Sequence, residues 1–256
     1  MFASTPNPIV LHADQEHSGI RMAIFLSLFA ALFVGFLLAR WLLLTLAPPA
    51  IQDYAIFLAC VGALPLALLF IWGLEKTLKR VWHSGLSLVL DGRGLSVHDR
   101  RDGAVVDPNA PPAFLWAANM GQLNWYFRLS GYPRGGRERR APAKWLCLAT
   151  EMQQDDARLS IFTFMSPEAA STWTNDPRQG FHIINPAEVY DRSARTRLGP
   201  PVRPTIPHRL LQSKDARYWL AERRRWEFGI ELTPDDFTTL MRSVAAGRAG
   251  IVSPSP

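Results

Sequence analysis

The chain has 256 residues, of which 48% are hydrophobic and 20% are charged, with a formal net charge of +6. This composition is typical of an ordered protein and excludes wholesale disorder. Its two cysteines, Cys60 and Cys147, exclude a disulfide scaffold and a four-cysteine zinc site, so we expect two buried free thiols. Residues 1–75 carry two basic and four acidic residues, whereas residues 76–256 carry 26 basic and 18 acidic ones. The basic part therefore favours an anionic partner such as lipid headgroups, an acidic protein or nucleic acid.

Two long apolar segments near the N-terminus predict a transmembrane helical hairpin. Residues 22–39 form a run of 18 residues without a charge, and residues 54–74 form a run of 21. Each run can cross a hydrocarbon core of about 30 Å, and we expect spans over about 22–46 and 54–74. A signal peptide fits the first run less well, because about twenty residues precede it and a second apolar run follows at once.

Basic residues flank this hairpin unevenly. Arg21 precedes the first run and Lys76, Lys79 and Arg80 follow the second, whereas Arg40 is the only basic residue near the turn. The positive-inside rule therefore predicts a multi-pass protein of the bacterial inner membrane with both termini in the cytoplasm. Neither run contains an acidic residue, a lysine or a histidine, so the sequence predicts no ion path or transport site.

Small residues recur at every fourth position of both runs and predict close helix packing. They are Ser27, Ala31, Gly35 and Ala39 in the first run and Ala55, Ala59, Ala63 and Ala67 in the second. This spacing keeps them on one helix face, where two backbones can approach closely. Either the two stripes pack on each other, which we favour, or they form a docking face for another membrane protein. Pro65 is expected to kink the second helix.

From His83 onward the hydrophobic pattern changes to a period of two residues, which predicts β-strands. Residues 84–175 are predicted to form about six antiparallel strands and a short helix that begins at Ser166, in a small sandwich or open barrel. The expected organisation is a cytoplasmic tail, the hairpin, an antiparallel β domain, a helical or irregular extension and a flexible tail, at residues 1–20, 21–75, 76–175, 176–246 and 247–256.

A strong helix start at residues 233–236 precedes an amphipathic stripe of Phe237, Leu240, Met241 and Val244. The order of elements resembles that of membrane-anchored bacterial proteins with PH-like domains. It consists of the hairpin, the strand–Asp-Gly–strand pattern of residues 86–98, the strand around Trp116 and this last helix. The resemblance covers about half of the chain and implies a binding or scaffolding module. Residues 176–232 depart from it, because a PH-like domain would place its closing helix sooner.

The sequence contains no motif for catalysis, a metal or a cofactor, and we predict none of the three. It lacks a G-x-S-x-G elbow, a Walker loop and an H-E-x-x-H pair. His98 and Asp99, at a strand end, fit a general base with its orienting group, and His182 is a further candidate, but a surface turn is the commoner setting for such a pair.

A loop rich in glycine and arginine, predicted over residues 130–142, is the strongest candidate binding segment. The basic residues of this loop, and the one beyond it, are Arg134, Arg137, Arg139, Arg140 and Lys144. Near a bilayer such a loop can bind anionic headgroups at about 1 kcal/mol per basic residue, or it can bind an acidic protein. A solvated loop without a ligand is an equal alternative. A second basic cluster, residues 223–225, adjoins Trp219 and Trp226 and is more simply a solvated helix face.

These features favour a non-enzymatic, membrane-anchored adaptor, accessory subunit or assembly factor whose β domain binds a protein partner or an anionic lipid. The alternative is an enzyme that acts on a lipid or a membrane-proximal substrate, with His98, Asp99 and His182 as its best residues. Nucleic-acid binding is the weakest hypothesis, and steep salt dependence would be its signature.

Overall fold

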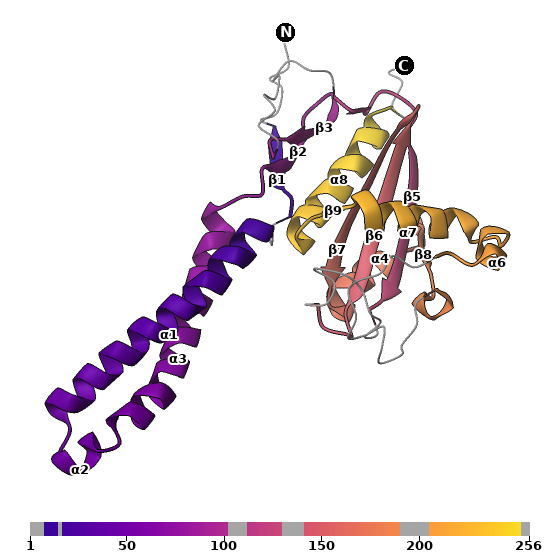
Figure 1. Cartoon of the computed structure of the whole chain (residues 1–256). Coiled ribbons are helices and arrows are strands. Elements are labelled where there is room, and N and C mark those ends of the chain that lie inside the picture. The colour runs from indigo at the N-terminus through magenta and orange to yellow at the C-terminus, as the bar shows by residue number, and fades with distance from the viewer. Residues whose placement is uncertain (1–7, 15–16, 102–111, 130–140, 190–204, 252–256) are drawn as a thin grey trace, which may run out of the picture. The chain divides into compact units, whose positions relative to one another are not determined.

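The computed structural model describes residues 8–14, 17–101, 112–129, 141–189 and 205–251. Its contacts divide the chain into a helical hairpin of residues 15–84 and a β domain formed by residues 1–14 and 85–256. In chain order the hairpin is therefore an insertion in the β domain (Figure 1). Two long apolar helices near the N-terminus and a β-sheet-rich domain with C-terminal helices agree with the predicted architecture.

The hairpin consists of two long helices joined by a short one: α1 (Ser18–Leu46), α2 (Pro49–Gln52) and α3 (Ala55–Val81). Both long helices are long and apolar enough to cross a membrane. Pro65 lies inside α3, and the positive charges of Lys79 and Arg80 occupy its last turn, where they complement the helix dipole.

The two stripes of small residues lie between the long helices. The four alanines of the α3 stripe are at most 3% exposed, and the four small residues of the α1 stripe are half-buried. A Cβ atom on Gly35 would lie 3.6 Å from the Cβ of Ala63, so the two backbones approach closely at this level. Large apolar side chains such as Phe33 and Leu69 point outward instead and are exposed. Cys60, expected to be buried, is exposed because it follows Ala59 and falls outside the stripe.

Sheet A of the β domain is antiparallel and joins one strand that precedes the hairpin in the chain with three strands that follow it. In order across the sheet, its strands are β1 (Ile9–His12), β2 (Leu86–Leu90), β3 (Gly94–Asp99) and β4 (Phe114–Leu115). Leu11 of β1 lies opposite Leu88 of β2. Residues 9–12, assigned from the sequence to an N-terminal tail, are thus an edge strand of this sheet.

Sheet B has an antiparallel centre and two parallel edge strands. In order across the sheet, its strands are β8 (Phe181–Ile183), β5 (Gly121–Arg128), β6 (Leu146–Gln154), β7 (Ala157–Met165) and β9 (Ile230–Glu231). The central meander β5–β6–β7 is the one that the alternating pattern predicts. The parallel edges come from residues 176–232, which the sequence assigns to a helical or irregular extension.

The helices α4 (Pro167–Thr174) and α8 (Pro234–Ile251) begin next to residues whose side chains cap them. The Ser166 side chain accepts a hydrogen bond from the Ala169 N–H at the start of α4, and Thr233 accepts one from the Asp236 N–H at the start of α8. The helical segments are α4 (Pro167–Thr174), η2 (Pro177–Gln179), η3 (Pro186–Glu188), α6 (His208–Leu211), α7 (Ala216–Phe228) and α8 (Pro234–Ile251).

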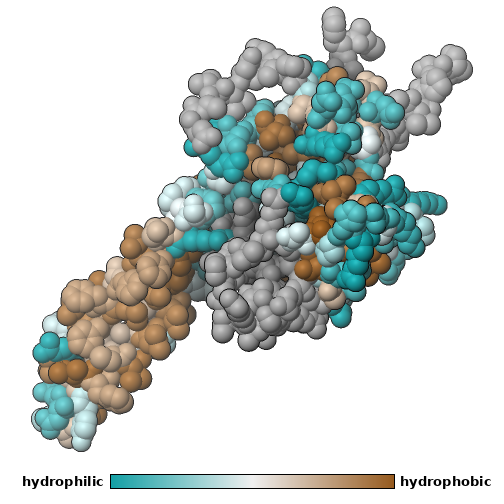
Figure 2. Space-filling model, turned by 45° about the vertical axis from the view of Figure 1, so that its right-hand side comes forward, coloured by the Kyte–Doolittle hydropathy of each residue, from teal (hydrophilic) through white to brown (hydrophobic). Residues whose placement is uncertain are grey.

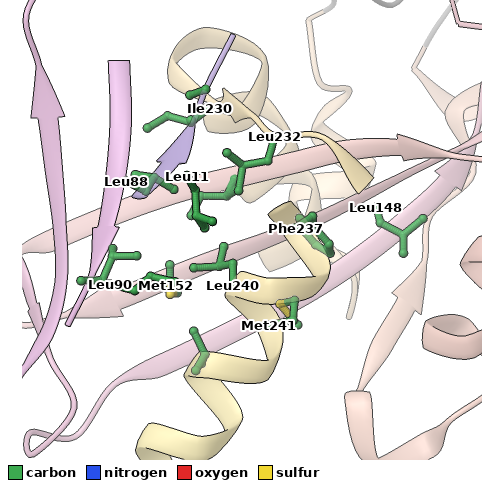
Figure 3. Close-up of a cluster of buried hydrophobic side chains, with 14 of the residues drawn as sticks. Leu11, Leu88, Leu90, Leu148, Met152, Ile230, Leu232, Phe237, Leu240 and Met241 are labelled. Atoms are coloured by element: carbon green, nitrogen blue, oxygen red, sulfur yellow. The ribbon is translucent and has the colours of Figure 1, made fainter. Parts of the chain in front are cut away.

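The first hydrophobic core is built around α8. Its predicted stripe is buried in one cluster with side chains from both sheets, among them Leu88 and Leu90 of sheet A and Leu148 and Met152 of sheet B (Figure 3). The side chain of Gln154 in β6 exchanges two hydrogen bonds with the backbone of Leu115 in β4, which ties the sheets together at one edge. The closing helix of the chain therefore joins the two sheets.

The second hydrophobic core lies on the opposite face of sheet B, under α7. Successive residues of β6 alternate between the two cores, since Cys147 belongs to this one and Leu148 to the other. Trp125 and Phe127 of β5 pack here against Tyr218 and Trp219 of α7. Sheet B is thus covered on both faces, which explains why its central strands are almost wholly buried.

Candidate functional site

The predicted basic loop falls mainly outside the described residues. Arg134, Arg137, Arg139 and Arg140 belong to residues 130–140, of which the structure gives no account. Lys144 is exposed in the turn before β6. The loop connects the Arg128 end of β5 to the Leu146 end of β6, which are opposite each other in the sheet. Its binding role stays a prediction.

The arginine cluster of α7 is a set of ion pairs and not a free basic surface. The guanidinium of Arg224 donates two hydrogen bonds of 2.6 Å to the carboxylate of Glu151 on β6. Arg225 is buried and donates two bonds of 2.8 Å to Glu222, which also accepts the indole N–H of Trp125. These contacts neutralise the charges and hold α7 on sheet B. The sequence does not predict the ion pair between Arg224 and Glu151, because the two residues are 73 positions apart.

The three residues of the enzyme alternative do not gather in one site. His98 and Asp99 lie on β3 of sheet A, and His182 lies on β8 of sheet B. The side-chain and backbone hydrogen bonds of Arg101 lower the pKa of Asp99 to about 2, so its carboxylate is a weak base. Within the described ranges, no three His, Cys, Asp or Glu residues lie close enough to hold a metal ion.

A pocket of about 530 Å³ opens at the edge of sheet B. β8 pairs only with residues 124–126 of the eight-residue strand β5. The pocket lies beside the part of β5 where this pairing stops. Its volume is in the range of small-molecule pockets. The lining residues come from β5, the η2 turn, α7 and α8 and are Gln122, Leu123, Asn124, Arg178, Gln179, Gly180, Arg217, Tyr218, Met241 and Ala245.

A hydrogen-bonded network forms the polar side of this pocket. The Asn124 carbonyl oxygen accepts from the Gln122 amide at 3.0 Å and from the Thr150 hydroxyl at 2.7 Å. The Asn124 amide donates to the Gln179 carbonyl at 2.6 Å. This last bond fixes the η2 turn against β5 and thereby sets the backbone position of Arg178.

A second group positions Arg217 in the first turn of α7. Its guanidinium donates to the Tyr218 hydroxyl at 3.0 Å and lies 4.8 Å from the centre of the Tyr218 ring. The same ring is stacked on His182, with centroids 4.1 Å apart. Asp215 lies 3.0 Å from the Nε2 atom of His182, although without the alignment of a hydrogen bond. These aromatic contacts restrict the arginine and its supporting tyrosine.

The sequence alone does not predict this pocket. The polar residues Gln122 and Asn124 share one face of a predicted strand, but their partners on other elements are 26 to 119 residues further along the chain. Comparison of the chain with protein-family models, with curated proteins and with solved structures finds no match.

Proposed function

We propose that this chain is a membrane-anchored adaptor whose hairpin crosses the bacterial inner membrane twice and whose β domain binds a partner in the cytoplasm. The observation that carries the proposal is the surface of the hairpin. Its inner face is closed by the alanine stripe, while its outer side chains are large, apolar and exposed. On the face shown in Figure 2, the hairpin is predominantly hydrophobic along its length, and hydrophilic residues gather at its turn. Soluble monomers rarely expose large contiguous apolar patches, so this surface favours a membrane environment.

The orientation is supported by strand pairing as well as by charge. β1 precedes α1 and pairs with β2, which follows α3, so both ends of the hairpin enter one sheet. A hairpin with this connectivity keeps both chain termini on one side of a bilayer. The basic residues Lys76, Lys79 and Arg80 at the domain end favour the cytoplasmic side.

The role of the β domain as a binding module is supported by its architecture. A PH-like domain closes its two sheets with a C-terminal helix, and here α8 shares one core with both sheets. The segment from η2 to β9 would then be an addition before the closing helix. The charge of the basic loop favours an acidic protein partner or anionic lipid.

Membrane extraction followed by purification tests this proposal. The full chain, expressed in a bacterium, should stay in the membrane pellet after washes with alkaline carbonate and with urea, and should dissolve only in detergent. A matched variant in which a Gly/Ser linker replaces residues 18–81 should appear in the soluble fraction. Release of the full chain by carbonate would contradict membrane insertion. After mild-detergent purification, a stoichiometric protein partner would identify an accessory subunit, whereas lipid alone would favour headgroup binding.

A further inference from the structure

We propose that the pocket at the edge of β5 is a binding site for the phosphate group of a small molecule, either a soluble phosphate ester or a phospholipid headgroup. This inference goes beyond the proposed function, because it concerns the β domain and does not depend on membrane crossing. The evidence lies in the charge of the pocket, in the way its donors are held and in its size.

The lining of the pocket is positively charged. Within the described part of the chain, it contains two arginines, Arg178 and Arg217, and no acidic residue. Among the residues that the structure describes, neither guanidinium has a carboxylate within ion-pair distance, in contrast to the arginines at positions 223–225. Asp215, two positions before Arg217, lies against His182 instead. The two positive charges are therefore available to an anion.

Both arginines come from backbone segments that the fold holds in place. The η2 turn is closed by the Asp176 side chain, which accepts from the Arg178 N–H at 3.0 Å, and is tied to β5 through Asn124. The Tyr218 hydroxyl and ring hold the Arg217 guanidinium. A guanidinium held in the way that Arg217 is held loses less conformational entropy when a ligand binds.

Two guanidinium groups from separate segments fit a phosphate better than a carboxylate. A carboxylate satisfies one planar guanidinium fork with its two oxygens. A phosphate monoester carries a charge of about −1.5 to −2 at pH 7 and has three strong acceptor oxygens, so it can accept bonds from two arginines at once. Leu123, Met241 and Ala245 provide an apolar side for the remainder of the molecule.

The test measures binding of glycerol 3-phosphate to the full chain in an uncharged detergent, by calorimetry. Arg178→Glu and Arg217→Glu should each weaken binding about tenfold or more, since each removes a charged hydrogen-bond donor. Both side chains are exposed, so folding is expected to survive these changes. The matched control is Arg128→Glu at the other end of β5, six residues and about 20 Å from Gln122. Its affinity should stay within about twofold of the parent.

A competition experiment with short-chain dihexanoyl phosphatidic acid distinguishes the two possible sources of the phosphate group. Tighter binding of this lipid than of glycerol 3-phosphate assigns the site to a headgroup, and the reverse assigns it to a soluble ester. Absence of binding by both compounds would overturn the inference, as would equal binding by the parent and by both pocket variants. The extraction experiment does not depend on this result, so failure of the site leaves the membrane proposal standing, and the converse also holds.

Discussion

Replacement of Arg225 by alanine is expected to lower the free energy of unfolding of the β domain by about 3–5 kcal/mol. Arg225 is only 2% exposed, and its guanidinium donates two hydrogen bonds of 2.8 Å to Glu222. It also lies 4.6 Å from the centre of the Phe162 ring. Without Arg225, the carboxylate of Glu222 stays buried beside the neutral indole N–H donor of Trp125. An uncompensated buried charge is the source of the large cost.

The measurement is urea unfolding of the full chain in detergent, with near-ultraviolet circular dichroism as the signal. Arg223→Ala is the matched control, because this neighbouring arginine is exposed and its Nε lies 3.7 Å from the Glu227 carboxylate, beyond hydrogen-bond distance. Its effect should stay within about 0.5 kcal/mol. Equal small losses for the two variants would show that Arg225 is not held in the buried pair.

Phe237→Ala is expected to cost about 3–5 kcal/mol of stability, the usual range for the loss of a buried aromatic side chain. Phe237 is fully buried in the first turns of α8, within the cluster that joins both sheets (Figure 3). Its ring contacts Trp173 of α4 edge to face, with centroids 6.4 Å apart. The cavity would therefore open where α8, α4 and the sheets meet.

Phe228→Ala provides the comparison for this substitution, because Phe228 is 77% exposed at the end of α7. Its unfolding free energy should change by no more than about 0.5 kcal/mol. A cost at Phe237 as small as that at Phe228 would mean that α8 does not close the core. The two variants use the same amino-acid change, so they differ only in burial.

Much of the fold follows from short-range patterns. The lengths of the apolar runs predict α1 and α3, and the alternation around Trp125 predicts β5 with its buried face. The cap at Thr233 and the spacing of Phe237, Leu240, Met241 and Val244 predict α8 and the side that it buries. In each case the signal lies within one element, where backbone geometry fixes the periodicity.

These short-range patterns do not predict contacts between segments that are distant in the chain. β1 is a four-residue strand that pairs across the whole hairpin, and its sequence alone does not distinguish it from a tail. The buried carboxylate Glu151 resembles a surface residue in the sequence, because its partner Arg224 is 73 residues further along the chain. The sequence does not predict the pocket for the same reason, since Arg178 and Arg217 are 39 residues apart in the chain.

Cysteine accessibility across the membrane tests the central claim most directly. In a Cys60→Ser background, in which Cys147 is fully buried, Ala50→Cys marks the α2 turn and Gln153→Cys marks an exposed end of β6. A membrane-impermeant maleimide should label Ala50→Cys in intact spheroplasts and should label Gln153→Cys only after lysis. Labelling of Gln153→Cys in intact spheroplasts, or labelling of Ala50→Cys only after lysis, would contradict a hairpin that crosses the membrane and anchors the β domain in the cytoplasm.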